Sequence, residues 1–131
     1  MKRILLTLAL LLTSVTLMAA TDWITLTTTA AFPGRFQSAG TSDGIRMYII
    51  GGLYASTPLD DVWSSTNGVD WTLETDAAEF GGRGNGNALY YDNKFWFIGG
   101  YDSVAHNDVW SSTDGKTWTE VIATAPWERL S

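Results

Sequence analysis

A duplicated segment constrains the fold of this chain more than any other feature. DVWSSTNGVDW at 61–71 returns as DVWSSTDGKTW at 108–118. The double glycines Gly51-Gly52 and Gly99-Gly100 shift together with it, as do the apolar runs that precede them. A period just under fifty residues is the mark of a repeat architecture, in which each repeat forms one supersecondary unit.

Each unit contains four short strand signals separated by turn residues. In the second unit the tight breaks are Asp92-Asn93 and Asp114-Gly115, with a loop at Gly99-Gly100. Asp, Asn and Gly tolerate the positive φ of tight hairpins, so the pattern predicts an antiparallel four-stranded unit and an all-β fold. The expected strands of the second unit are Asn85–Tyr91, Lys94–Ile98, Asp108–Ser112 and Thr117–Ile122.

Partial units flank the two complete ones, which span about 35–76 and 83–123. The spacing from Trp23 to Arg35 repeats that from Trp71 to Arg83, and Trp118 precedes Arg129 by nearly the same distance. We therefore expect a leading outer strand before the first unit and the start of a further unit at the end.

The N-terminus has the pattern of an export signal. Lys2 and Arg3 precede the apolar run Ile4–Leu12, and Met18-Ala19-Ala20 offers a cleavage region. The alternative, an uncleaved anchor, is less consistent with an apolar stretch that is short and interrupted by hydroxyl residues. The sequence predicts a signal peptide at 1–20, a repeat domain at 21–131 with no stable membrane span after cleavage, and a secreted, periplasmic or cell-surface location.

Charge and composition narrow the classes of partner. The formal net charge is −6, and removal of the signal makes the chain more acidic. Nucleic acid and anionic lipid require clustered Lys and Arg, so neither is expected as a partner. The chain has no cysteine and one histidine, His106, so we expect no disulfide, no metal site and no cofactor.

The unit as a whole resembles the kelch repeat. The resemblance covers about 23–129 and rests on the double glycine after an apolar strand, followed by two spaced tryptophans. It implies a β-propeller like the central domain of galactose oxidase, although one histidine and no cysteine leave no place for that enzyme's copper chemistry. The residues of the repeat are Gly51, Gly52, Trp63, Trp71, Gly99, Gly100, Trp110 and Trp118.

Propellers close their ring with about 4–8 blades. Two complete blades plus the flanking pieces imply either a fragment of a longer propeller, whose remaining blades lie in a longer chain, or a homo-oligomer of partial rings. In both cases the two blades expose apolar flanks.

The segment Ser111–Trp118 also resembles the Asp-box of sialidase-type propellers, with Asn67 replacing Asp114 in the first copy. In that family the box is a hairpin away from the active site. We expect the Asp114 side chain to accept backbone N–H groups of the turn and Trp118 to pack beneath it. The alternating oxygen ligands of a calcium loop are missing.

Chain direction predicts which loops share one face. The segments before each first strand and the loops at 53–60 and 101–107 lie together, opposite the tight turns, and longer loops commonly carry recognition. Alternatively, the recurring arginines pair with carboxylates or loop carbonyls as structural residues, and the tyrosines cap a blade edge instead of stacking on a sugar. The candidate ligand face comprises Arg35, Gln37, Tyr54, Arg83, Asn85, Asn87, Tyr101 and His106.

No nucleophile–base pair is recognisable, and the acidic pair Asp60-Asp61 matches Asn107-Asp108 and so belongs to the repeat. The favoured interpretation is an exported, non-catalytic kelch-like module for protein or glycan recognition. The alternatives are a fragment of a carbohydrate-active propeller enzyme, mutarotase-like or glycoside-active, and a structural module of a larger surface protein.

Overall fold

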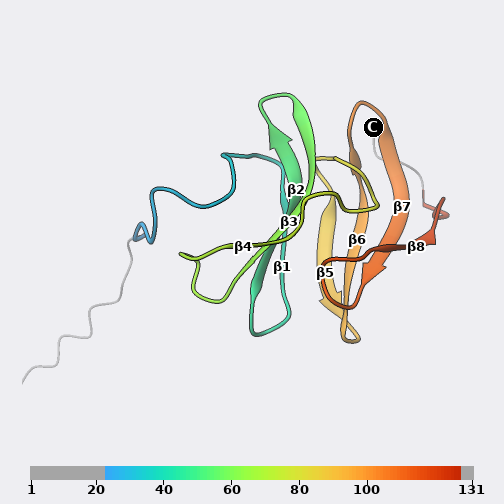
Figure 1. Cartoon of the computed structure of the whole chain (residues 1–131). Coiled ribbons are helices and arrows are strands. Elements are labelled where there is room, and N and C mark those ends of the chain that lie inside the picture. Colours follow the sequence, from blue (N-terminus) through green and yellow to red (C-terminus); the bar gives the residue numbers. More distant parts are fainter. Residues whose placement is uncertain (1–22, 128–131) are drawn as a thin grey trace, which may run out of the picture.

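The computed structural model describes residues 23–127, which form two four-stranded antiparallel sheets (Figure 1). The first sheet has the order β1-β2-β3-β4 and the second β5-β6-β7-β8, so each strand pairs with its neighbours in sequence. For the described residues, the prediction of an all-β fold with two four-stranded antiparallel units is confirmed. The predicted signal at 1–20 and the start of a further unit after Trp127 lie outside the described residues. The strands are β1 Ala39–Ser42, β2 Met47–Tyr54, β3 Thr57–Ser65, β4 Thr72–Thr75, β5 Asn87–Tyr91, β6 Lys94–Tyr101, β7 Ala105–Ser112 and β8 Thr119–Ile122.

The loops expected after the double glycines are largely absent, which corrects the sequence prediction. β2 and β3 continue through 53–60 and leave only Ala55-Ser56 as the turn, while β6 and β7 leave 102–104. The physical reason is a bulge. Gly51 and Gly52 have φ of 56° and 106°, and the pairing shifts register between Ile50 and Gly52. Glycine accepts these angles without strain, so the strand absorbs an extra residue instead of ending.

The prediction of a leading outer strand is wrong. Residues 23–34 form no strand, and Trp23 and Ile24 are 103% and 77% exposed. An outer strand needs a third strand of its own sheet to pair with. The first sheet already has β4 in that place, so the segment runs irregularly beside it, with Leu26 close to Gly68.

Several strand ends also differ from those expected. β5 begins at Asn87 because Asn85, with φ of 57°, cannot continue a strand. β8 begins at Thr119 because the backbone N–H of Thr117 is used by the preceding turn. The Asp92-Asn93 turn is as expected, with φ of 52° and 57° at the two residues.

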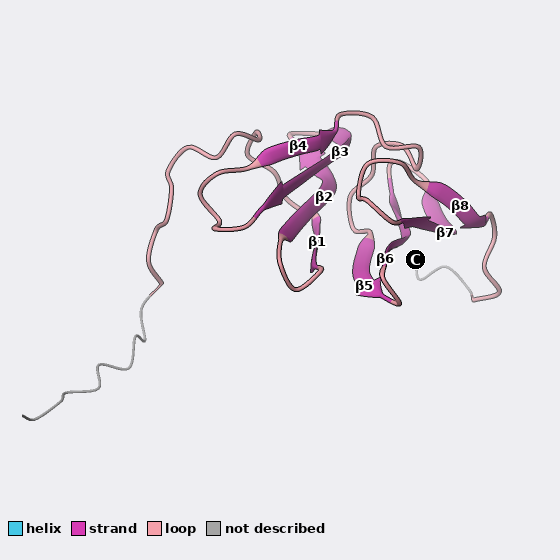
Figure 2. Ribbon diagram, turned by 60° about the horizontal axis from the view of Figure 1, so that its bottom comes forward, coloured by secondary structure: helices cyan, strands magenta, loops and turns pink. Residues whose placement is uncertain are grey.

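The core lies between the two sheets, in a contact that we call the seam. β1 lies beside β5 (Figure 2), and the first sheet contributes the buried side chains of Tyr48, Ile50 and Val62. Phe95 and Phe97 of the second sheet meet them, and the rings of Tyr48 and Phe95 are 4.4 Å apart. Neither sheet buries this surface alone, which is the physical reason why the two repeats fold as one unit.

Candidate functional site

The recurring arginines are part of buried networks that tie each unit together. Arg35 donates two hydrogen bonds to the Asp61 carboxylate, at 2.6 and 2.9 Å, and a third to the Gly51 carbonyl. Asp61 also accepts a hydrogen bond from the Trp63 indole at 2.6 Å. Burial raises the pKa of Asp61, but the hydrogen bonds from Arg35 and Trp63 outweigh it and hold this pKa below 3.8.

The second unit has the corresponding network, but its arginine donates one hydrogen bond to the carboxylate instead of two. Arg83 donates to Asp108 at 2.7 Å, and to the carbonyls of Gly99 and Phe80. Trp110 donates its indole N–H to Asp108 at 2.8 Å. The Arg35 and Arg83 side chains are only 3% and 5% exposed. Both arginines therefore pair with carboxylates, as in the structural alternative to ligand binding. Their guanidinium groups are turned away from solvent.

The hairpins that resemble Asp-boxes have the expected structural contacts. Asp114 accepts backbone N–H groups from Lys116 and Thr117, at 2.8 and 3.0 Å, and these bonds hold its pKa below 3.8. Trp118 is 3% exposed and packs edge-on against Phe80. In the first unit Asn67 makes the corresponding backbone contacts. These polar residues therefore stabilise turns.

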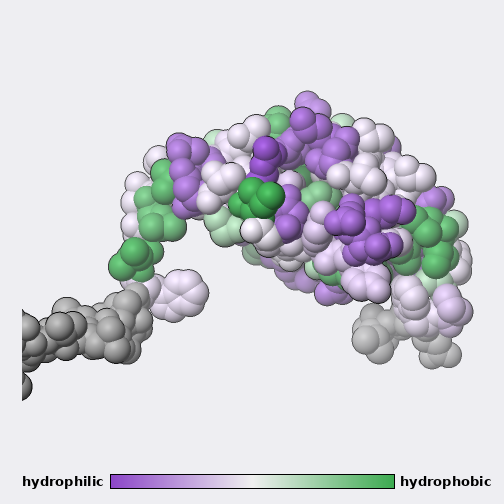
Figure 3. All heavy atoms as spheres, turned by 90° about the horizontal axis from the view of Figure 1, so that it is seen from below, coloured by the Kyte–Doolittle hydropathy of each residue, from purple (hydrophilic) through white to green (hydrophobic). Residues whose placement is uncertain are grey.

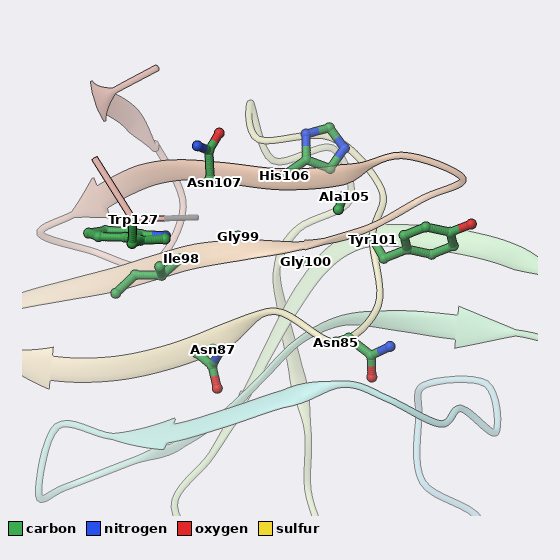
Figure 4. Close-up of a pocket in the computed structure, with 10 residues that line it drawn as sticks. All are labelled: Asn85, Asn87, Ile98, Gly99, Gly100, Tyr101, Ala105, His106, Asn107 and Trp127. Carbon is green, nitrogen blue, oxygen red and sulfur yellow. The ribbon is translucent and has the colours of Figure 1, made fainter. Parts of the chain in front are cut away.

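A groove of about 410 Å³ on the second sheet contains half of the predicted ligand face (Figure 4). It lies on the side of the sheet that faces away from the seam, which we call the free flank of the second sheet and define by Asn87, Leu89, Trp96 and Ile98. Of the predicted residues, the groove is lined by Asn85, Asn87, Tyr101 and His106. The structure does not bring Arg35, Gln37, Tyr54 or Arg83 to it.

The groove is lined by both apolar and polar side chains. Ile98 and the Trp127 ring lie beside each other at one end, and Trp127 is 48% exposed (Figure 4). His106 and Asn107 come from β7 on one side. The imidazole Nε2 of His106 is 3.1 Å from the Asp102 carboxylate, whose pKa is lowered by the Val104 backbone N–H and also by His106.

Sequence reasoning missed Trp127 and Asn107. Asn107 donates its side-chain amide to the Ala125 carbonyl, and Ala125 returns a backbone hydrogen bond to the Asn107 carbonyl. This pair fastens the segment that carries Trp127 to the second sheet. The signal was present in the repeat, because Trp127 occupies the position of Phe80 and Asn107 that of Asp60.

The groove on the second sheet corresponds, by the repeat, to a space on the first sheet. In the first sheet that space lies in the seam and is filled by polypeptide. In the first sheet the corresponding space holds the backbone of Gly82 and Arg83: Gly52 donates to the Arg83 carbonyl at 3.0 Å, and Arg83 donates to the Leu59 carbonyl at 3.1 Å. The lining differs between the copies. Ala39, Leu53 and Leu59 of the seam are replaced by Asn87, Tyr101 and His106.

Comparisons with models of known protein families and with curated proteins found no match. The kelch resemblance therefore rests on the repeat residues alone. Between Trp23 and Trp127, no three His, Cys, Asp or Glu side chains lie together in a way that could hold a metal ion. The same part of the chain contains no helix with the length and hydropathy needed to cross a membrane.

Proposed function

We propose that this chain is an exported, non-catalytic recognition module whose two sheets are successive blades of a kelch-like propeller. Its partner is a protein, which binds the groove and the free flank of the second sheet. A secreted, periplasmic or cell-surface location follows from the N-terminal export pattern.

One observation carries the proposal. The strands around the groove correspond to those around a space on the first sheet, and that space is filled by a segment of this same chain. The Gly82–Arg83 segment fills that space in the seam through backbone hydrogen bonds and close packing. The open copy adds Tyr101 and Trp127, each about half exposed, with asparagine and histidine beside them. Aromatic anchors with a polar rim are typical of non-obligate protein interfaces.

Photocrosslinking tests this assignment. Asn87→p-benzoyl-phenylalanine places the reactive group in the groove, and Ile45→p-benzoyl-phenylalanine, at an exposed turn of the first sheet, is the matched control. We expect irradiation of cells that produce the protein to give a polypeptide adduct from position 87 and none from position 45. No adduct, or equal adducts from both positions, contradicts the proposal.

A glycan array provides the second arm of the test. Binding of a glycan by the wild-type protein that is lost in Asn87→Ala and His106→Ala would assign the groove to carbohydrate and overturn the protein assignment. Asparagine, histidine and exposed aromatic rings are also the side chains that recognise sugars, so this arm is required.

A further inference from the structure

The seam within the chain provides a template for a contact between two copies. The second sheet covers one face of the first, and the repeat makes the two outer flanks equivalent to the two faces buried in the seam. We define the free flank of the first sheet by Met47, Ile49, Trp63 and Leu73. In the space-filling view, hydrophobic residues are visible at both ends of the molecule (Figure 3).

One ion pair of the seam is replaced on the free flanks by two apolar residues. Lys116 reaches across the seam to the Glu74 carboxylate, at 3.4 Å. The repeat counterpart of Lys116 on the first sheet is Val69, and that of Glu74 on the second sheet is Val121. These valines are 41% and 48% exposed. The lysine and the glutamate of the seam are thus both replaced by valine on the free flanks. One valine lies on the first sheet and the other on the second.

A second seam contact has an equally compatible replacement. Tyr48 of the first sheet packs against Phe95 of the second, with ring centroids 4.4 Å apart. The counterpart of Phe95 on the free flank of the first sheet is Met47, which is 43% exposed, and the counterpart of Tyr48 on the second sheet is Trp96. Methionine sulfur against an aromatic ring is a favourable contact.

A glycine supplies the third observation. At Gly82 a Cβ would lie 2.7 Å from the Pro58 carbonyl oxygen of the first sheet, so the seam requires glycine there. Its counterpart Gly34 does not have a positive φ, and apart from its two chain neighbours no described residue has an atom within 4 Å of a Cβ built on it. Nothing in this part of the chain requires glycine at position 34, whereas a neighbour packed as in the seam would.

We infer that a second copy of this chain is the protein partner, and that the free flank of its first sheet docks on the free flank of the second sheet, head to tail. This inference rests on the proposed function. On the first sheet Phe32 packs on Trp63 and Trp71, much as Phe80 packs on Trp118 in the seam. The contact is heterologous, so copies close a ring or extend as a filament.

A charge-swap cycle tests the inference by sedimentation velocity over a range of protein concentrations. The wild-type protein is expected to self-associate. Val69→Lys and Val121→Glu are each expected to lower the association constant at least about tenfold, because each puts an unpaired charge against an apolar partner. The double variant recreates the Lys116–Glu74 pair between copies and is expected to recover to within about threefold of wild type. Ile45→Lys is the exposed control and should change nothing.

Gly34→Ala separates docking from folding. It should leave the thermal midpoint unchanged while weakening self-association at least about fivefold, because the added methyl meets the partner's backbone. Gly82→Ala, by contrast, should lower the thermal midpoint. A wild-type protein that stays monomeric, additive effects of the two charge changes, or normal association in Gly34→Ala would each overturn the inference. A crosslinked adduct from Asn87 that contains a different protein would overturn the inference and leave the proposed function standing.

Discussion

The buried pair of Arg35 and Asp61 predicts a large loss of stability in Asp61→Asn. The amide still accepts a hydrogen bond, but Arg35 keeps its charge at 3% exposure with no carboxylate opposite. Removal of one member of a buried pair commonly costs 3–5 kcal/mol. The hydrogen bond to Gly51 and the stacking of Arg35 over the Phe32 ring, at 5.1 Å, both remain. We therefore expect a loss of about 3 kcal/mol in the free energy of unfolding.

Urea denaturation followed by tryptophan fluorescence measures this loss. The double variant Arg35→Met with Asp61→Leu removes both charges and should lose less than Asp61→Asn alone, because no unpaired charge stays buried. Asp108→Asn is the matched variant in the second unit and should behave alike. A loss below about 1 kcal/mol for Asp61→Asn would show that the pair behaves as a solvated surface pair, contrary to this prediction.

The same pair makes the free energy of unfolding depend on pH in the acidic range. The pKa of Asp61 is lowered below 3.8, so its contribution is fully present above pH 3.8 and is lost as the pH falls through the lower, folded-state pKa. Denaturation midpoints measured from pH 6 downwards should therefore decline more steeply in wild type than in Asp61→Asn. Parallel declines would contradict this assignment.

Three further predictions concern single side chains. Asp114→Ala should cost about 1–2 kcal/mol, because two backbone N–H groups of the turn lose their acceptor; an unchanged midpoint in urea would contradict this. Asn67→Asp should destabilise the first hairpin, because the Asn67 amide donates to Asp70 at 2.9 Å and a carboxylate would repel it; a neutral result in thermal melts would show that this contact is solvated. Tyr48→Phe should cost about 1 kcal/mol by removing the hydrogen bond to Asp43. Burial and this bond raise the pKa of Tyr48 to about 12, so wild type should lose this contribution between pH 10 and 12 while Tyr48→Phe does not.

Local side-chain chemistry made the turns and the repeat networks predictable. Asn67 and Asp114 were expected to accept turn N–H groups, and they do so because this chemistry acts over two or three residues. The course of the chain after the double glycines was not predictable from the same residues. Gly51-Gly52 suits both a loop and a bulge, and pairing with β3 selects the bulge.

In the groove, too, some residue positions could be predicted from the sequence and others could not. The structure brings together in one groove Asn85, Asn87, Tyr101 and His106, which chain direction also places near one another. Arg83 was grouped with them, yet it turns inward because a buried carboxylate, Asp108, lies within reach. A pairing between residues twenty-five positions apart depends on how the strands meet in space.

The period, the all-β class and the four strands of each sheet could be predicted from the residues alone, because turn chemistry and strand patterning act between near neighbours. Which faces of the sheets are covered depends on tertiary packing. Tyr48 and Trp96 are repeat counterparts on identical strand positions, but Tyr48 is buried in the seam and Trp96 lies on a free flank. Burial depends on what packs against a surface, and a repeat specifies the same surface whether or not a neighbour is present.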